Sequence, residues 1–489
     1  GERSLHRLID TSASWEGSLR LRDWLAATTP DLERTRSRQA LVRELAARAA
    51  FRDRLAYHAR RASQGTFRHW EGERLQNWLS EHALSEMPSL PLRGLTLLAA
   101  VNAILFIVAQ AAHTLPFWAL TFLPYVGWYL WKVWELRDPF ETSLALLDPL
   151  NDLRAVFETL ETYGYGRAER LRELCAPFLE HDRRPSDEVR RLTRVLAAAS
   201  LRGNPLLWML ISMILPWDVY VACWLNKRRV ALGALLPGWL DRWFELEALN
   251  GLATLAYLNP DYTYPEWIED EVQVRPVFEA RELGHPLIPE DRCVCNDFSL
   301  DALGEMALIS GSNMSGKSTF LRTLGVNLCL ANAGAPVNAR LFRAVPFRLF
   351  SCIRVTDSVT DGISYFYAEV KRLKALLMAL QQDHPFPLFF LIDEIFRGTN
   401  NRERMIGSRS YIRALVGQHG TGAISTHDLE LVKLADELAR IVNYHFAETI
   451  ADGRMLFDYT LRAGPCPTTN ALRIMRMEGL PVEPAGPDS

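Results

Sequence analysis

The chain has 489 residues, which is long enough for two or more domains with cores of their own. Its 55 Lys and Arg residues and 58 Asp and Glu residues give a net charge of -3, which neither requires nor excludes a nucleic-acid partner, because a balanced total can hide a basic face. The 7 cysteines include no C-x-x-C pair, which indicates a reducing compartment. The chain begins with Gly1 rather than Met, so residues upstream are expected to be missing.

Residues 1–92 are predicted to form the first part of a helical core. Leu41, Leu45, Ala49 and Leu55 recur at near-helical spacing in a background rich in Arg and Glu. The arginines could contact DNA phosphates. A solvated helix face, with acids between the arginines, is the favoured interpretation.

The stretch from Gly94 to Trp131 contains no Asp, Glu, Lys or Arg. It is close to twice the ~20 apolar residues that a membrane span needs. The sequence H-T-L-P at 113–116 predicts a turn in its middle, so residues 93–137 are predicted to form a transmembrane hairpin. Arg93 and Lys132 flank it, which would leave both ends on the cytoplasmic side. The alternative is a helical hairpin buried in a large soluble core. Aromatic residues that could form an interfacial belt are Trp118, Trp128, Tyr129 and Trp131.

Residues 138–258 are predicted to complete the helical core. Within them, 204–225 is again apolar, but Pro216 and Asp218 interrupt it. Because an Asp in the middle of a membrane costs a few kcal/mol, a core helix or an interfacial segment is favoured over a third span. The basic run 227–229 that follows could rest on anionic headgroups, where each residue would contribute about 1 kcal/mol of electrostatic attraction.

A glycine-rich loop dominates the second half of the chain. The stretch 309–319, I-S-G-S-N-M-S-G-K-S-T, fits G-x-x-x-x-G-K-[ST] between a predicted strand and a predicted helix. The backbone N–H groups of such a loop hold nucleotide phosphates, and the helix N-terminus adds partial positive charge. Lys317 would reach the β- and γ-phosphates, and Ser318 would bind Mg²⁺. The residues expected to bind ATP are Gly311, Ser312, Asn313, Met314, Ser315, Gly316, Lys317, Ser318 and Thr319.

Two later strand ends would complete this site. The apolar run 388–392 predicts a strand buried on both faces, and it ends in Asp393 and Glu394. Asp393 would hold Mg²⁺, and Glu394 would activate water as a general base. A further predicted strand leads to His427, which could sense the γ-phosphate. The expected cofactors are therefore ATP and Mg²⁺.

Together these segments resemble the MutS family of ABC-type ATPases. The loop at 311–318 is similar to the family's G-P-N-M-G-G-K-S, and D-E-I-F-R-G-T at 393–399 is similar to D-E-I-G-R-G-T. The segment S-T-H-D-L at 425–429 resembles the family's A-T-H-x-x strand end, and G-I-S-Y-F-Y-A-E at 362–369 resembles its signature segment G-x-S-x-F-x-x-E. Further similar segments are G-H-P-L at 284–287, the stretch from Asp10 to Leu25, and R-Q-A-L-V at 38–42.

The resemblance implies an α-helical core domain plus a C-terminal α/β P-loop NTPase domain of the ABC type. It also implies a homodimer with composite ATP sites, in which ATP binding drives closure. Lys317, Glu394 and His427 would act on ATP in one subunit, while Ser364 would contact the γ-phosphate held by the partner. The expected segments are the core at 1–92 and 138–258, the hairpin at 93–137, a connector at 259–290, the ATPase domain at 291–480 and a disordered tail at 481–489.

Some positions depart from the family pattern. Ser312 stands in place of Pro and Ser315 in place of Gly, which both look tolerable. The segment N-N-R at 400–402 replaces S-T-Y, and 464–471 replaces a segment that usually reads S-Y-G-I-x-V-A. The family's mismatch-reading wedge, Phe-x-Glu, is not found ahead of the helical core. The resemblance therefore implies ATP-driven switching more directly than mismatch recognition.

Two classes of function follow. The favoured one is an ATP-dependent DNA-binding protein of the mismatch-repair type. The alternative is a membrane-anchored switch ATPase that acts on a protein or lipid partner without DNA. An ABC transporter subunit fits less well, because L-S-G-G-Q is absent and two spans are few for a transport pathway. In the first two cases the ATPase would be cytoplasmic and attached to the inner membrane through residues 94–131.

Overall fold

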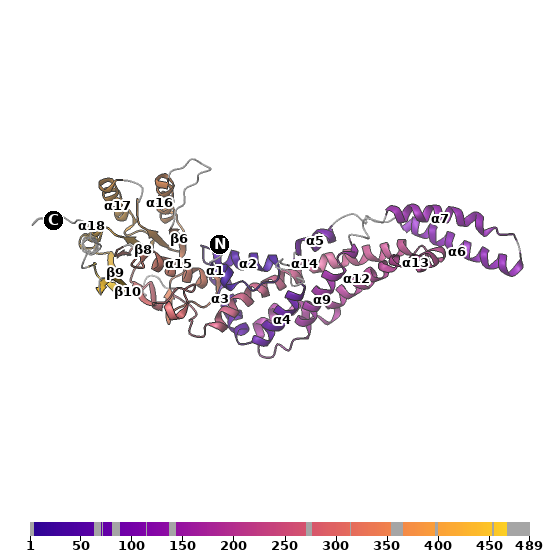
Figure 1. Cartoon of the computed structure of the whole chain (residues 1–489), viewed down its shortest axis with the longest axis horizontal. Coiled ribbons are helices and arrows are strands. Elements are labelled where there is room, and N and C mark those ends of the chain that lie inside the picture. The colour runs from indigo at the N-terminus through magenta and orange to yellow at the C-terminus, as the bar shows by residue number, and fades with distance from the viewer. Residues whose placement is uncertain are drawn as a thin grey trace, which may run out of the picture. The chain divides into compact units, whose positions relative to one another are not determined.

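The computed structural model describes residues 4–62, 70, 72–80, 89–113, 115–135, 143–269, 276–312, 314–353, 365–396, 400–451 and 454–466. The chain divides into two compact units (Figure 1). A helical unit comprises residues 11–20 and 47–251, and a sheet unit comprises residues 1–10, 21–46 and 252–489. Each unit is described by itself.

The helical unit is built from helices of very different length, and α14 and α2 are shared with the sheet unit. Its elements are α2 (Trp15–Ala26), α4 (Ala49–Ala62), α5 (Gly72–Ser80), α6 (Ser89–Ala112), α7 (Trp118–Glu135), α9 (Leu147–Thr162), α10 (Glu169–Leu174), α11 (Ala176–Leu179), η2 (His181–Arg183), α12 (Pro185–Ala199), η3 (Ser200–Gly203), α13 (Pro205–Ile214) and α14 (Trp217–Leu258).

A buried carboxylate connects the start of the helical unit to α14. Glu247 accepts hydrogen bonds from the backbone N–H groups of Ala13 (3.1 Å) and Ser14 (3.2 Å), and also from the Ser14 hydroxyl. A Cβ at Gly17 would lie 2.5 Å from this carboxylate, so only glycine fits there. The glycine at position 17, within the stretch from Asp10 to Leu25 that resembles the family, is thus explained by the close approach of Glu247.

The predicted hairpin is present, and its surface is apolar. Helices α6 and α7 pack against each other in an antiparallel pair, with Leu95, Ala99, Tyr125 and Tyr129 between them. Within the described residues, Leu92–Ala112 is the one unbroken helix that is long and apolar enough to cross a membrane, and only 17% of its window is buried. The described residues of this chain therefore leave most of the apolar window of α6 uncovered.

The sheet unit contains a six-stranded and a four-stranded sheet. The six strands follow the order β10-β9-β4-β8-β7-β6, and all neighbours are parallel except β10 and β9. The strands of this sheet are β4 (Met306–Ser310), β6 (Arg348–Cys352), β7 (Leu388–Asp393), β8 (Gly420–Thr426), β9 (Ile441–Ala451) and β10 (Arg454–Ala463). The second sheet has the order β1-β5-β2-β3, from β1 (Glu266–Trp267), β2 (Phe278–Leu283), β3 (Asn296–Leu300) and β5 (Leu341–Ala344).

Helices cover the six-stranded sheet because β4, β7 and β8 are buried on both faces. One face packs Leu308, Phe390 and Ile424 against α16, α17, α18 and α19. The other face meets α15 and the small sheet, where the rings of Phe389 and Phe278 lie 5.1 Å apart. The helices of this unit are α1 (Leu5–Ile9), α3 (Leu32–Ala46), η4 (Glu290–Arg292), α15 (Lys317–Ala333), α16 (Tyr365–Gln381), α17 (Asn401–Leu415), α18 (Leu429–Val432) and α19 (Leu434–Glu437).

Two stretches differ in detail from the sequence-based expectation. The connector at 259–290 contributes β1 and β2 to the small sheet, and β2 buries Phe278, Ala280 and Leu283 across a register shift. The atypical segment at 400–402 starts α17, where the Asn400 side chain accepts a hydrogen bond from the backbone N–H of Glu403 at 2.9 Å. Asn is among the preferred N-cap residues, so this departure preserves the helix start.

Candidate functional site

The glycine-rich loop lies at the carboxyl end of β4, between strands β8 and β9. Gly311 has φ 146° and Gly316 has φ 109°, both in the region that favours glycine. A Cβ at Gly311 would lie 2.8 Å from the carbonyl oxygen of Phe446, and one at Gly316 would lie 3.1 Å from the ring of Tyr459. The loop backbone is therefore enclosed by β9 and β10, and α15 starts directly behind it.

Lys317 directs its ammonium group into this loop. The Nζ atom donates hydrogen bonds to the carbonyl oxygens of Gly311 and Ser312, each at 2.7 Å, and the residue is buried. The charge thus lies beside the N-terminus of α15, where the helix dipole adds to it. Met314 is exposed at positive φ, whereas Ser315 is buried beneath the loop. The expected residue Asn313 lies outside the described part of the chain.

Three neighbouring strand ends bring a carboxylate and two hydroxyls together. Asp393, at the end of β7, accepts hydrogen bonds from the hydroxyls of Ser318 and Ser425, each at 2.8 Å. Asp393 is buried. The structure thus brings the predicted residues Ser318 and Asp393 together, and Ser425 on β8 is an additional member of the group. A carboxylate beside a serine hydroxyl supplies the hard oxygen ligands that Mg²⁺ prefers.

Glu394 and His427 face each other at the next position along the same strand ends. The His427 Nδ1 atom lies 3.1 Å from the Glu394 Oε1 atom. Glu394 has φ 61°, and its backbone N–H donates to the carbonyl and the hydroxyl of Ser425, each at 3.2 Å. A non-glycine residue at positive φ is uncommon and is typical of functional sites. The backbone bend turns Glu394 towards the cavity beside the loop, whose lining includes it.

The segment that resembled the family's signature lies only partly within the described residues. Ser364, the expected contact to a partner's nucleotide, lies outside them. Glu369, five residues later on α16, is buried and accepts a hydrogen bond from the backbone N–H of Phe396 at 2.7 Å. This bond joins the first part of α16 to the turn that follows Glu394.

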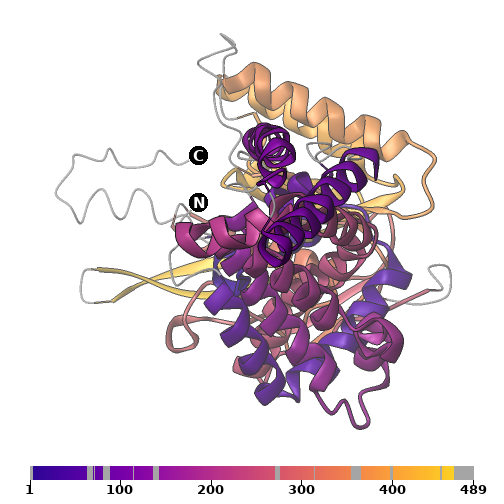
Figure 2. The same cartoon turned by 90° about the vertical axis from the view of Figure 1, so that its right-hand side faces the viewer.

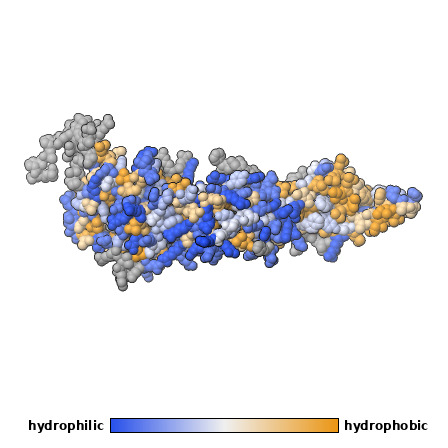
Figure 3. Space-filling model, turned by 90° about the horizontal axis from the view of Figure 1, so that it is seen from below, coloured by the Kyte–Doolittle hydropathy of each residue, from blue (hydrophilic) through white to orange (hydrophobic). Residues whose placement is uncertain are grey.

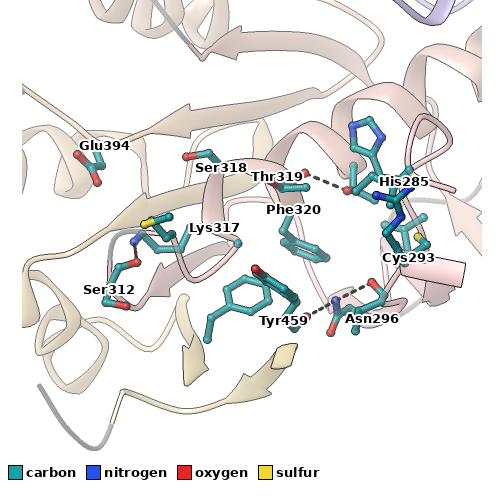
Figure 4. A pocket seen from close by; sticks show the side chains of 18 residues that line it. His285, Cys293, Asn296, Ser312, Lys317, Ser318, Thr319, Phe320, Glu394 and Tyr459 are labelled. Atoms are coloured by element: carbon teal, nitrogen blue, oxygen red, sulfur yellow. Dashed lines mark hydrogen bonds between the residues drawn. The ribbon is translucent and has the colours of Figure 1, made fainter. Parts of the chain in front are cut away.

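A cavity of about 660 Å³ opens beside the loop (Figure 4). Figure 4 shows Lys317 and Ser318 between Glu394 on one side and His285 and Cys293 on the other. Residues that line the cavity include His285, Ile288, Cys293, Asn296, Ser312, Met314, Lys317, Ser318, Thr319, Phe320, Glu394 and Tyr459. Its size is in the range of small-molecule sites, and its lining combines apolar side chains with charged ones, which include Lys317, Glu394 and Arg292.

The sequence-based prediction missed Tyr459, which lies over the loop. Tyr459 has φ 54° and sits in a register shift of the β9–β10 pair. Asn296 holds this irregular turn, because its amide donates to the Tyr459 carbonyl at 3.0 Å and accepts from the Leu461 N–H at 2.6 Å. The strands continue past this point as a hairpin, drawn in yellow in Figure 2. A β-bulge has no reliable sequence signal, so Tyr459 could not be located from the sequence.

His285 closes the far end of the cavity. Burial, followed by the charge of Arg322, lowers the pKa of His285 below its usual value of 6.5. Its Nδ1 atom accepts a hydrogen bond from the Leu287 N–H at 3.1 Å, so the proton of the neutral ring is on Nε2. Burial also raises the pKa of the nearby Cys295 thiol to about 11, which keeps that thiol protonated and unreactive.

A side-chain contact links the loop to β9. The hydroxyl of Ser312, which stands where the resemblance would have Pro, donates to the carboxylate of Glu448. Proline has no side-chain donor, so this bond depends on the substitution. It joins the loop to the same hairpin that carries Tyr459.

Comparison with known proteins places this arrangement in a family. Residues 307–484 match the family model of MutS domain V. Residues 307–484 thus carry a MutS-type domain, and the chain is similar to MutS proteins over about half of its length. The chain is mainly helical and has an α/β sheet domain at its C-terminus. This C-terminal domain is consistent with MutS domain V.

Curated relatives support the same family. The DNA mismatch repair protein MutS 2 of Halobacterium salinarum is 32% identical over 247 residues, which is 48% of this chain and 27% of the relative. The DNA mismatch repair protein MutS of Chloroflexus aurantiacus is 31% identical over 248 residues, 49% of this chain and 24% of the relative. The DNA mismatch repair protein MutS of Caulobacter sp. (strain K31) is 33% identical over 245 residues, which is 46% of this chain and 27% of the relative. The chain thus aligns with about a quarter of the length of each relative.

Proposed function

We propose that this MutS-family chain is an ATP hydrolase of the P-loop, ABC type, which uses ATP to drive conformational switching of a homodimer. The observation that carries the proposal is the convergence of Lys317, Ser318, Asp393, Glu394 and His427 at the carboxyl ends of three adjacent parallel strands. Ligand sites of open α/β sheets occupy this edge.

The loop binds the phosphates of the nucleotide, and the cavity beside it binds the base. The backbone N–H groups of 311–319, the N-terminus of α15 and the Lys317 ammonium bind the phosphates. Lys317 exchanges its bonds to the loop carbonyls for phosphate oxygens, which are stronger, charged acceptors. The Tyr459 ring lies beside Gly316 and lines the cavity, where it stacks on the base.

Ser318 and Asp393 fit a magnesium ion. Their oxygen atoms are already adjacent, and a hydroxyl plus a carboxylate leave the remaining positions to water and phosphate, as Mg²⁺ prefers. When bound, the ion neutralises charge on the β- and γ-phosphates. Glu394 takes a proton from the attacking water, and His427 orients the Glu394 carboxylate through its Nδ1 contact.

Dimer switching and DNA binding rest on the family. The relatives are named DNA mismatch repair proteins, and a second subunit would supply Ser364 to complete the site. A nucleotide that binds better to the closed dimer shifts the population towards it. We therefore place this chain among ATP-dependent DNA-binding proteins of the mismatch-repair type, in the cytoplasm.

A second candidate is a membrane-anchored switch ATPase that acts on a protein or lipid partner without DNA. The low burial of α6 favours it. In this case the ATPase is attached to the cytoplasmic face of the inner membrane through residues 94–131, and DNA does not affect hydrolysis.

The test is the rate of ATP hydrolysis by the full chain in detergent, without DNA and with homoduplex, mismatched or branched DNA, at two salt concentrations. Stimulation that weakens as salt rises supports the DNA-binding function, because phosphate contacts release counterions. Unchanged hydrolysis with every DNA supports the membrane-anchored switch. Absence of hydrolysis in all samples contradicts the proposed ATPase.

A further inference from the structure

Helices α6 and α13 expose large apolar side chains and bury polar ones, although α6 also buries Leu95 and Ala99 against α7. On α13, Leu206 is 72% exposed and Ile214 is 70% exposed, whereas Ser212 is only 6% exposed. On α6, Ile104 and Ile107 are exposed while Asn102 is buried. Soluble proteins place apolar side chains inside and polar ones outside, so this arrangement is the reverse of the usual one. Figure 3 shows hydrophobic residues gathered over α6, α7 and α13, at the right-hand end of that view.

A polar cluster lies beneath the apolar surface. Asp218, which is 2% exposed, accepts a hydrogen bond from the Trp208 Nε1 atom at 2.8 Å and further hydrogen bonds from Arg202 and the Tyr129 hydroxyl. The Tyr129 hydroxyl also lies 2.8 Å from the Ser212 hydroxyl. We call these five residues the Asp218 cluster. The cluster joins α7, η3, α13 and α14, and within it the Asp218 carboxylate forms an ion pair with the Arg202 guanidinium.

We propose that α6, α7 and α13 form a single element that inserts into an anionic phospholipid bilayer, with the α6–α7 hairpin across the hydrocarbon core and α13 in the interface. The proposal deepens the membrane-anchored candidate by naming its partner and by adding α13. It does not depend on ATP hydrolysis.

The dimensions of the helices fit a bilayer. Helix α6 has 24 residues, which at ~1.5 Å per residue is about 36 Å, against a hydrocarbon core of ~30 Å. The tip between the two helices carries no Asp, Glu, Lys or Arg, and Leu115 and Phe117 are exposed there. Helix α13 has 10 residues, about 15 Å, which is too short to span and suits an interfacial position.

The charges near the open end of the hairpin fit an anionic surface. Arg93 is exposed at one end of the hairpin, and Lys132 lies at the other, where it pairs with Glu135 and lies 4.9 Å from the ring of Trp131. Lys227 is exposed on α14, after the apolar segment. Aromatic and basic residues at the ends of an apolar element are typical of a membrane interface with anionic lipids.

The Asp218 cluster explains why an acid is tolerated in this region. A lone Asp within an apolar element is costly, but one that is paired and hydrogen-bonded inside the element is not exposed to lipid. Because its members come from four elements, the cluster also fixes α13 against α7. The three helices therefore enter the bilayer together rather than separately.

The experiment is flotation of the full chain, purified in detergent and then diluted with vesicles of phosphatidylcholine alone or mixed with phosphatidylglycerol. We expect the protein to float with both vesicle types, and more completely with phosphatidylglycerol. The variant Ile107→Asp with Leu123→Asp, two exposed positions of the hairpin, should lower the partition coefficient by roughly a hundredfold or more. The matched control, Met378→Asp with Ile406→Asp, changes equally exposed apolar residues of α16 and α17 and should float like the parent.

The position of α13 is read out by hydrogen exchange of residues 205–214. Exchange there should slow when vesicles are added. If exchange is unchanged while the protein floats, α13 is not in the interface and that part of the proposal is wrong.

Two results would overturn the whole proposal. One is a parent protein that stays in the aqueous phase as a discrete oligomer, because its apolar surface would then be an interface between copies. The other is equal flotation of the hairpin variant and the parent. ATP hydrolysis is measured in the same samples, so loss of hydrolysis with normal flotation contradicts the ATPase function alone.

Discussion

Replacing Glu394 by Gln tests the chemistry of the nucleotide site most directly. The change keeps the shape of the side chain and the backbone bend at φ 61°, but it removes the carboxylate that faces His427 at 3.1 Å. Loss of a general base lowers a rate by roughly 10²–10⁴-fold, which corresponds to about 3–5 kcal/mol in the activation free energy. ATP affinity should change little, because Lys317, Ser318 and Asp393 remain.

The assay combines phosphate release with calorimetric titration of ATP. We expect slow hydrolysis, normal binding and, on a sizing column with ATP, a larger share of dimer than in the parent. Glu430→Gln is the matched control, since Glu430 is an exposed acid on the nearby α18 and pairs with Lys433 of the same segment at 2.6 Å. Hydrolysis at the parent rate in Glu394→Gln would refute the assignment of the base. Loss of both binding and hydrolysis would show that Glu394 maintains the loop instead.

Three further predictions concern charged groups. Lys317→Ala should abolish ATP binding in calorimetry while the fold, measured by circular dichroism, is retained. Glu247→Gln should lower the stability of the helical unit by about 2–3 kcal/mol, because the carboxylate accepts three hydrogen bonds. This loss corresponds to a decrease of roughly 4–12 °C in Tm. Glu245→Gln, a more exposed change two residues away, should leave Tm within about 2 °C, and equal shifts for both would contradict the argument. Asp218→Ala should destabilise the helical unit by about 3–5 kcal/mol in thermal denaturation, since Arg202 loses its carboxylate, and an unchanged Tm would mean that the pair is not buried.

Much of the geometry of the proposed nucleotide site was predictable, because a phosphate-binding loop imposes strict local requirements on its residues. Gly311 and Gly316 occupy backbone conformations that favour glycine, and Asp393 and Glu394 directly follow a strand buried on both faces. Parallel strands place their carboxyl ends at one edge, so the pairing of Ser318 with Asp393 follows from the strand order. The hydrogen bond between Ser318 and Asp393 joins the glycine-rich loop to the end of β7, and each of these two segments has a recognisable sequence pattern.

Contacts that depend on irregular pairing or on distant residues were not predictable. Tyr459 reaches the loop through a register shift in β10, and nothing in the sequence of that strand marks the shift. The bond between Ser312 and Glu448 joins residues 136 positions apart, and neither residue type is unusual. Nothing in the sequence marks Arg202 as the partner of Asp218, the acid whose isolated charge would disfavour a third membrane span.

The charges of the helical unit bear on the choice between the two proposed functions. Arg154 pairs with Glu158 one turn along α9 at 2.6 Å, and Arg191 pairs with Glu188 on α12 at 2.5 Å. These arginines thus have acids on their own helix, which agrees with a solvated face and weakens their attraction for phosphate. Faces of this kind offer few unpaired positive charges to neutralise DNA phosphates. The logarithm of the DNA affinity should fall with the logarithm of the salt concentration, with a slope of about 0.9 for each phosphate neutralised. A slope of many units would point to a cationic surface beyond these paired helices, whereas a slope near zero would leave the apolar surface of α6, α7 and α13 as the main contact of the helical unit.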